Sequence, residues 1–435
     1  MPSSDSFVPD SYLPDNGNRG YSVDRYELDL EYKVASNRLS GKAVVHAVPD
    51  VELDTFSLDL GPALSVSKVA VGGMRGVRFT HRGGKLRVTT PRPMAAGTPF
   101  VLTVSYSGNP APIDGVWGDV GWEELTDGAI VASQPNGAAS WYPCDDHPSS
   151  KAAYTISITT DSPYQVVSNG TLTQKKTRSS RTTWVFEQPE PMASYLATVQ
   201  IGQYEHHRVS SSPVRIDAFL PRRLRKNFDH DFGRQQQMMA TFVESFGPYP
   251  FDAYAVVITD DDLEIPIEAQ TLSVFGANHC DGDREYERLV AHELAHQWFG
   301  NSLTSGRFRD IWLHEGFACY SEWIWSEASG GPSAADEAAD AHDRLSSLDQ
   351  DIVLGDPGPD DMFDDRIYKR GALALHALRR TIGSGSFFDL LREWTSRFQH
   401  STVITSDFVE LANTFGSTDE FWESWLEKKK LPDLP

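Results

Sequence analysis

The sequence predicts an α+β fold, with an N-terminal antiparallel β domain over residues 1–205 and a mainly helical domain over residues 206–435. Two observations support this prediction. In the first part, short segments alternate between apolar and polar residues, which is the pattern of a strand with one solvated face. From about Leu220 the apolar residues recur instead at helical spacing. The chain has 435 residues, 40% of them hydrophobic, so we expect two or three domains with ample cores.

The strand pattern is clearest near the start of the chain, where Tyr26, Leu28 and Leu30 alternate with acidic residues. The glycine pair at 83–84 separates two similar runs and predicts a hairpin turn. The other runs that we expect to form strands are 42–47, 55–60, 67–71, 77–82, 85–90, 100–106, 154–159 and 183–187.

Helical spacing in the second part first extends over 222–246 and ends before a Gly-Pro pair. An apolar run at 255–258 predicts one buried strand, and the Asp-, Pro- and Gly-rich segment 356–365 predicts a loop. The further segments that we expect to be helical are 336–348, 372–382, 385–398, 407–415 and 418–429.

The composition excludes several kinds of partner. A formal charge of −22 and a pI near 4.9 give a surface that repels nucleic acid and anionic membranes. No run approaches the roughly 18 apolar residues of a membrane span. The first residues, Met1 to Ser6, lack the basic and apolar regions of a signal peptide, and three scattered cysteines make no disulfide framework. We therefore expect a cytoplasmic protein without nucleic-acid or membrane partners.

One stretch in the second part carries a metal-binding pattern, His-Glu-x-x-His, from His292 to His296. On a helix these two histidines lie on one face, one turn apart, so both imidazoles can bind one metal ion. Glu293 lies beside the first ligand and can reach a metal-bound water instead of the metal. Leu289, Val290 and Leu294 make the helix apolar on its other faces, so the polar groups are buried and need a partner.

A catalytic zinc site needs three protein ligands and one open position. After 18 intervening residues Glu315 follows His296, and it is the expected third ligand. The neighbouring His314 is the nearest rival but points about 100° away on a helix. Glu322 lies seven residues beyond Glu315 on the same face, where it can accept the second ring N–H of a ligand histidine. We expect one Zn²⁺ per chain.

With these residues the chain resembles the one-zinc aminopeptidases of the aminopeptidase N family, which belong to the Glu-zincin metallopeptidases. The segment 368–371 (Tyr-Lys-Arg-Gly) is similar to the family's Tyr-x-x-Gly. The segments 246–251 and 141–146 also resemble family landmarks. The resemblance covers nearly the whole chain from about Tyr21. It implies a thermolysin-like catalytic domain in a short form that lacks the C-terminal helical domain of larger members, so we expect a more open cleft or one closed by a partner chain.

The resemblance also implies roles for individual residues. Glu268 matches the glutamate that holds the free α-amino group of a peptide, which explains cleavage after the first residue. Tyr368 matches the tyrosine that donates its hydroxyl to the developing oxyanion, and Gln134 matches a glutamine that reaches into the active site. Glu293 is expected to take a proton from the attacking water and to deliver it to the leaving amine. The implied partners are peptides with a free N-terminus.

The chain departs from the family pattern at several positions, so other functions stay open. Asn136 stands where the family's Gln-x-Glu has glutamate, and Ile265, Pro266 and Ala269 replace residues of the Gly-x-Met-Glu-Asn segment. Among these differences, Asn136 and Pro266 favour an open-cleft zinc endopeptidase as the first alternative. The second is a zinc-binding scaffold with little turnover, which would not need Glu293 as a base. The sequence specifies neither the oligomeric state nor the preferred first residue.

Overall fold

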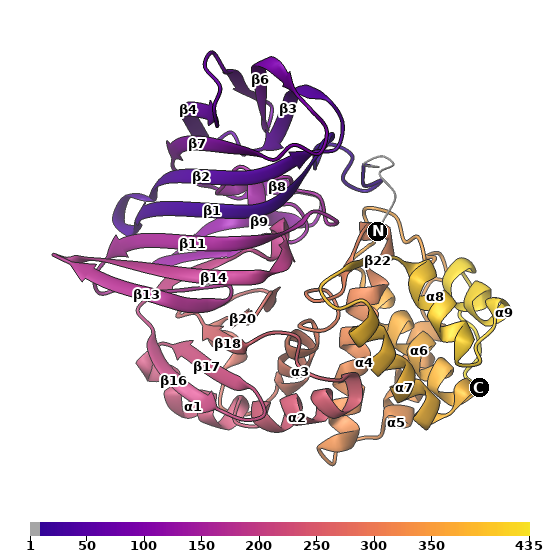
Figure 1. The fold of residues 1–435 in the computed structure, drawn as a ribbon. Coiled ribbons are helices and arrows are strands. Elements are labelled where there is room, and N and C mark those ends of the chain that lie inside the picture. The colour runs from indigo at the N-terminus through magenta and orange to yellow at the C-terminus, as the bar shows by residue number, and fades with distance from the viewer. Residues whose placement is uncertain (1–8) are drawn as a thin grey trace.

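The computed structural model describes residues 9–435, so Met1 to Ser6, on which the signal-peptide prediction rests, lie outside the described residues. β-sheets built from the first half of the chain lie on one side of the molecule, and helices from the second half lie on the other (Figure 1). The predicted α+β class is confirmed. Across residues 9–435 we find no helix that is both long enough and apolar enough to cross a membrane.

The largest sheet has seven strands in the order β13-β14-β11-β1-β2-β7-β4. Alternate residues of its strands are buried, as the period of two predicts; in β11, for example, Tyr154, Ile156 and Ile158 face the core. The sheet departs from the prediction at one pair, because β1 and β11 run parallel. Its strands are β1 Tyr21–Lys33, β2 Arg38–Pro49, β4 Leu64–Val71, β7 Phe100–Gly108, β11 Lys151–Asp161, β13 Thr171–Arg178 and β14 Arg181–Ala193.

Two smaller sheets complete the first half, in the orders β3-β6-β5 and β12-β15-β10-β9-β8. The Gly-Gly turn at 83–84 joins β5 and β6 in antiparallel register, as predicted. The strands of these sheets are β3 Leu53–Asp59, β5 Arg78–Arg82, β6 Lys85–Met94, β8 Ile113–Gly115, β9 Gly118–Leu125, β10 Gly128–Ala132, β12 Gln165–Ser168 and β15 Val199–Gly202.

A mixed five-stranded sheet, β16-β17-β18-β20-β19, lies between the β layers and the helices (Figure 1). The buried residues of its central strand β18 are all hydrophobic, as the run at 255–258 predicts. The strands are β16 Glu205–Ser210, β17 Arg215–Leu220, β18 Ala253–Ile258, β19 Ile267–Ala269 and β20 Leu272–Phe275. A short parallel pair, β21 Thr304–Ser305 and β22 Thr402–Val403, lies among the helices.

The second half is mainly helical. The predicted helix over 222–246 is wrong in one respect, because the chain leaves the helix after Asp231 and Gly233 divides it into α1 and α2. The helices are α1 Arg225–Asp231, α2 Gln235–Phe246, α3 Glu287–Ala295, α4 Trp312–Ala328, α5 Ala334–Ser346, α6 Asp365–Ile382, α7 Ser384–Arg397, α8 Thr405–Thr414 and α9 Asp419–Trp422, which continues as a short π-helix over Glu423–Glu427.

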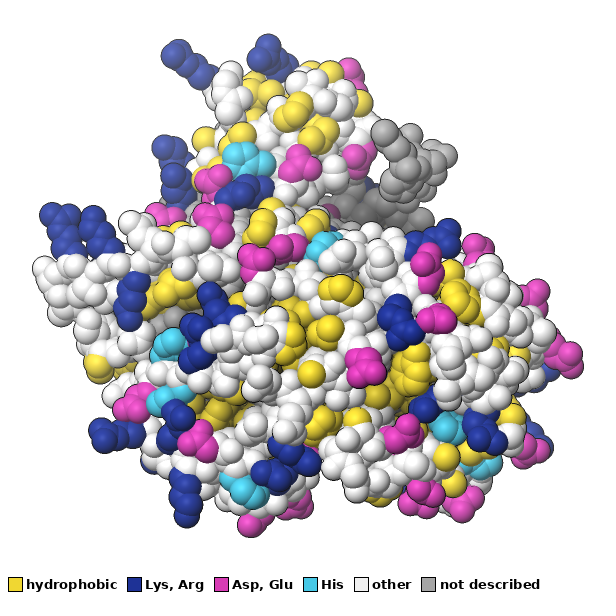
Figure 2. Space-filling model, turned by 60° about the horizontal axis from the view of Figure 1, so that its bottom comes forward, with side chains coloured by type: hydrophobic (Ala, Val, Ile, Leu, Met, Phe, Trp, Pro, Cys, Tyr) yellow, Lys and Arg dark blue, Asp and Glu magenta, His cyan; other side chains and the backbone are white. Residues whose placement is uncertain are grey.

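The two halves are joined by specific contacts besides the chain itself. Asp10 accepts a hydrogen bond from the backbone N–H of Phe308 at 2.7 Å, just before α4. Tyr12 makes a second contact close by, where its hydroxyl hydrogen-bonds to Asp356, a residue that also pairs with Arg309. One continuous hydrophobic core runs through both halves. On the face shown in Figure 2, basic and acidic side chains are interspersed among uncharged surface.

Candidate metal centre

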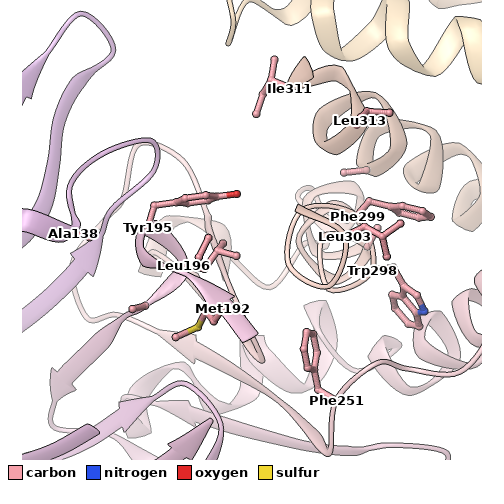
Figure 3. Packing of buried hydrophobic residues seen from close by; sticks show 14 of the residues in the cluster. Ala138, Met192, Tyr195, Leu196, Phe251, Trp298, Phe299, Leu303, Ile311 and Leu313 are labelled. Carbon is pink, nitrogen blue, oxygen red and sulfur yellow. The ribbon is translucent and has the colours of Figure 1, made fainter. Parts of the chain in front are cut away.

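The candidate metal centre lies where α3 and α4 cross. Both helices are buried along this contact, since Val290, Leu294 and Phe317 belong to the core around it. The aromatic residues that follow α3, Trp298 and Phe299, are buried and pack beside the helix (Figure 3). This apolar surrounding fixes the two helices relative to each other and therefore fixes the polar groups that they carry.

Three predicted ligands converge at this crossing. Nε2 of His292 and Nε2 of His296 lie 3.4 Å and 3.5 Å from the same carboxylate oxygen, Oε2 of Glu315. The three ligand atoms all lie within 4.8 Å of one another. Although burial opposes it, the two neighbouring histidines hold the pKa of Glu315 well below its usual range, so this carboxylate is ionised.

The second ring nitrogen of each histidine is occupied. Nδ1 of His292 lies 2.8 Å from Oε1 of Glu322, and Nδ1 of His296 lies 3.0 Å from the carbonyl oxygen of Phe299. Because both partners are acceptors, each Nδ1 donates to its partner and each Nε2 is directed at the centre, where it can bind a metal ion. Two imidazoles and one carboxylate arranged in this way match the donor set of a catalytic zinc ion, so the residues fit the metal.

Glu322 is itself held by two cations. Arg288 and Lys369 lie 3.4 Å and 3.9 Å from its carboxylate, and the side chain is only 6% exposed. Although burial opposes it, Lys369 and the hydrogen bond from His292 lower the pKa of Glu322. The sequence predicted Glu322 but gave no signal for Lys369, because nothing in its spacing links it to Glu322.

His314, the rival third ligand, points away from the centre. Its Nε2 accepts a hydrogen bond from the backbone N–H of Ser305 at 2.7 Å, and burial lowers its pKa to about 3. The ring is therefore neutral and supports the turn before α4.

Glu293 lies beside the ligands and is 5% exposed. It groups with Glu268 and His296, with ligand atoms within 4.8 Å of one another. Within residues 9–435 its Oε2 has no hydrogen-bond partner. Burial raises the pKa of Glu293 to about 7, although the two histidines oppose the increase. A buried carboxylate with a free oxygen and a pKa near neutrality is suited to accept and return a proton.

Tyr368 reaches the same centre from the first turn of α6. Its ring stacks on that of His292, with ring centroids 5.9 Å apart and planes 20° from parallel. Burial and the nearby carboxylates of Glu315 and Glu268 raise the pKa of Tyr368, so its hydroxyl keeps its proton and is a hydrogen-bond donor.

Two glycines set how closely α6 approaches α4. A Cβ atom added to Gly371 would lie 2.7 Å from the Cα of Gly316, which is closer than real Cβ contacts allow. Gly316 directly follows the ligand Glu315, and Gly371 lies one turn beyond Tyr368. The backbone contact between the two glycines therefore positions the tyrosine relative to the metal ligands.

The segment that carries Glu268 is strand β19, which pairs antiparallel with β20 at the edge of the five-stranded sheet. Burial raises the pKa of Glu268, while His296 opposes the increase. Pro266 precedes the strand rather than interrupting it, so its missing N–H costs no pair in this sheet.

Gln134 lies in the loop after β10. Its side-chain nitrogen is buried and has no hydrogen-bond partner among residues 9–435. Asn136, in the same loop, donates to the side chain of Asn16 at 3.3 Å, a contact 120 positions apart that the sequence pattern does not contain. No hydrogen bond in the described part links Gln134 to the metal ligands or to Glu268, so its role stays a prediction.

Tyr195 lies near the centre, and no sequence pattern singled it out. Its ring points from the β part toward α3 (Figure 3). The side chain is 4% exposed, and its hydroxyl has no hydrogen-bond partner in the described part of the chain. Burial, together with the charges of Glu268 and Glu315, raises its pKa. The charges of both predicted carboxylates therefore act on a buried hydroxyl that has no hydrogen-bond partner among residues 9–435.

Comparison with known proteins gives matches along most of the chain. The peptidase M1 N-terminal domain matches residues 22–196, and the peptidase family M1 domain matches residues 230–425. Among solved structures, an M1 zinc metallopeptidase variant from Deinococcus radiodurans, bound to a Tyr-Ser-Ala substrate, is 31% identical with a TM-score of 0.90, and the match covers 99% of each chain.

Two curated relatives are longer proteins. The leucyl aminopeptidase of Saccharolobus solfataricus is 25% identical over 94% of this chain and 54% of its own length. Aminopeptidase B of Rattus norvegicus is 24% identical over 76% of this chain and 53% of its own length. The chain thus spans about half the length of these relatives. Both family domains nevertheless match in order along it, and the chain belongs to peptidase family M1.

Proposed function

We propose that this chain is a zinc aminopeptidase that hydrolyses the N-terminal peptide bond of peptides with a free α-amino group. One observation carries the proposal: the carboxylate of Glu268 lies within 4.8 Å of both the candidate base Glu293 and the ligand His296. A second acidic group this close to a hydrolytic centre is not needed for hydrolysis. It is suited to bind the ammonium group of a substrate whose first peptide bond lies at the metal.

The residues that would hold one zinc ion are His292, His296 and Glu315. A zinc ion bound there supplies a Lewis acid that lowers the pKa of a water molecule to about 7. Glu293 takes the proton from the attacking water with its unpaired Oε2 and passes it to the leaving amine. Tyr368 donates its hydroxyl to the carbonyl oxygen as negative charge develops on it. Gln134, with its unpaired nitrogen, is proposed as a further substrate contact.

The comparisons support this proposal from another direction. The curated relatives are called aminopeptidases, and the matching solved structure contains a peptide with three residues. That peptide is Tyr-Ser-Ala, which is consistent with a site for short peptides.

The test compares amino-acid arylamides with the same compounds acetylated at the amino group. It uses the parent chain, Glu293→Gln and Glu268→Ala, with zinc content measured for each. We expect cleavage of the free-amine compounds alone, and loss of cleavage in both variants with zinc retained. Cleavage of acetylated compounds, unaffected by Glu268→Ala, would show an endopeptidase. Bound zinc without turnover of any compound would show a scaffold.

A further inference from the structure

The hairpin that carries Glu268 contains a strained turn. Strands β19 and β20 are joined by Gln270 and Thr271 alone. Thr271 has a φ of 72°, in the left-handed region that β-branched residues rarely adopt. Such a conformation persists only when the surrounding structure imposes it, and residues of this kind concentrate at functional sites. The contacts that impose this conformation on Thr271 therefore identify the part of the chain that positions the hairpin.

The hairpin is held against the chain that follows the zinc-binding helix. Oε1 of Gln297 accepts a hydrogen bond from the backbone N–H of Thr271 at 2.8 Å, and its Nε2 donates to the carbonyl oxygen of Ala269 at 3.0 Å. Asn301 donates to the same carbonyl, also at 3.0 Å. Both side chains are completely buried. We name Gln297 and Asn301 together the hairpin clamp.

The hairpin clamp connects the two functional groups by a short path. Gln297 directly follows the metal ligand His296, and Ala269 directly follows Glu268. One hydrogen bond, from Nε2 of Gln297 to the carbonyl oxygen of Ala269, therefore joins the residue after a metal ligand to the residue after the proposed amine anchor. The bonds between Gln297 and Thr271 and between Asn301 and Ala269 hold the same turn. The ends of this path have little freedom, because Gln297 fixes the hairpin through both its donor and its acceptor.

The clamp is itself fixed from the β part. The buried amine of Lys151, at the start of β11, donates to the carbonyl oxygens of Asn301 and Ser302 at 3.0 Å and 2.8 Å. On the other side of the hairpin, Asn169 donates to the carbonyl of Gln270 at 2.8 Å. The N–H of Gly170 donates to the hydroxyl of Thr271 at 2.7 Å. Residues of the β part and of the helical part therefore both hold the turn in place.

We infer that Gln297 and Asn301 are positioning residues that set the distance from the Glu268 carboxylate to the metal ligands. This distance determines the register of the substrate, that is, which peptide bond lies at the metal when Glu268 binds the α-ammonium group. This inference rests on the proposed aminopeptidase function. Successive residues of a peptide lie about 3.8 Å apart, so the anchor must be held to a fraction of that distance to select the first bond. A misplacement on the order of 1 Å at such a site can cost about 10²-fold in rate.

The test removes the donors of the clamp without introducing charge, with Gln297→Met and Asn301→Leu. Asn301→Ala, which also removes the donor and is smaller than leucine, is the second variant if the leucine variant does not fold. The matched control is Gln235→Met, because Gln235 is a fully buried glutamine in α2 whose side chain makes no hydrogen bond among residues 9–435. All are made in chains that also carry Glu293→Ala, so that binding is measured without turnover.

The readout is the affinity for Leu-Gly and for N-acetyl-Leu-Gly, measured by calorimetry at equal zinc content. We expect the clamp variants to bind Leu-Gly about tenfold or more weakly, with N-acetyl-Leu-Gly and the Gln235→Met control unchanged within twofold. Adding Glu268→Ala should abolish the difference between clamp variants and parent. In chains with Glu293 intact, kcat/KM for a leucine arylamide should fall by about 10²-fold.

Two results would overturn the inference, and they differ from a failure of the proposed function. If the clamp variants weaken both dipeptides equally, or still weaken binding when Glu268 is alanine, Gln297 and Asn301 act only on stability. If the clamp variants keep the full preference for the free amine, the register is set elsewhere. If the parent chain itself shows no preference for Leu-Gly, the aminopeptidase proposal fails and the inference fails with it.

Discussion

Replacing Glu322 should weaken zinc binding although Glu322 is not a ligand. Glu322→Leu removes the acceptor that lies 2.8 Å from Nδ1 of His292. Both side chains are nearly buried, at 6% and 7% exposure, so water does not replace the lost partner well. A buried hydrogen bond to a charged group contributes about 1.5–3 kcal/mol. At about 1.4 kcal/mol per tenfold, this corresponds to a zinc Kd raised by about 10- to 150-fold.

The assay is competition for zinc against a chelator of known affinity, with the melting temperature recorded for each variant. Glu322→Gln separates the contribution of the hydrogen bond from that of the charge. It keeps an acceptor oxygen for His292 but removes the charge that faces Arg288 and Lys369. It should fall between the parent and Glu322→Leu. The control is Glu327→Gln on the same helix, where Glu327 is 42% exposed and pairs with Arg379 at the surface. A zinc Kd for Glu322→Leu within twofold of the parent would refute this reasoning.

Three further predictions address the base, the helix contact and the domain junction. Glu293→Gln should lower kcat by about 10²- to 10⁴-fold and leave zinc bound, because the amide cannot accept the proton of the water. Gly371→Ala should cost about 1–3 kcal/mol of stability. It should also lower kcat/KM, because the added Cβ lies 2.7 Å from Gly316 and pushes Tyr368 from the ligands. Burial lowers the pKa of Lys151 to about 7, so Lys151→Met should change how stability depends on pH.

The sign of the Lys151 effect follows from proton binding. An unfolded lysine titrates near a pKa of about 10.4, so between pH 7 and that value the unfolded chain holds a proton that the folded chain lacks. The free energy of unfolding of the parent therefore rises with pH by up to about 1.4 kcal/mol per pH unit relative to Lys151→Met. Urea unfolding at pH 7.5 and 9.5 measures this slope, and equal slopes in the two proteins would contradict the prediction.

Each of the other two predictions has its own check. Gly385→Ala is the control for Gly371→Ala, because no atom lies within 4 Å of a Cβ added there. It should leave kcat/KM unchanged, and an equal loss in both alanine variants would contradict the helix-contact argument. For Glu293→Gln, single-turnover rates equal to those of the parent would show that another group accepts the proton.

The elements with strong periodicity were the ones that the sequence could predict. Residues on one face of a helix are fixed by its period, so His292 and His296 are brought together as expected, and Glu322 is reached from Glu315 in the same way. The alternation of apolar and polar residues likewise predicted the strands, since every second residue of β11 is buried. These features depend only on residues close in the chain.

The features that the sequence could not supply depend on residues far apart in the chain. The parallel pairing of β1 with β11 and the contact of Gly316 with Gly371 leave no local pattern. The left-handed conformation of Thr271 goes against its own preference and is imposed by Gln297 from another element. The predicted helix over 222–246 was wrong at 232–234 because apolar spacing continued through a break that Gly233 allows.

The central claim is that Glu268 fixes the amino end of a peptide one residue from the metal centre. The most direct measurement is mass spectrometry of the products from an unlabelled ten-residue peptide, sampled over time with zinc present. We predict a ladder in which single residues leave in order from the N-terminus, and no product from the same peptide acetylated at its amino group. Internal fragments that appear first, equally from both peptides, would contradict the account.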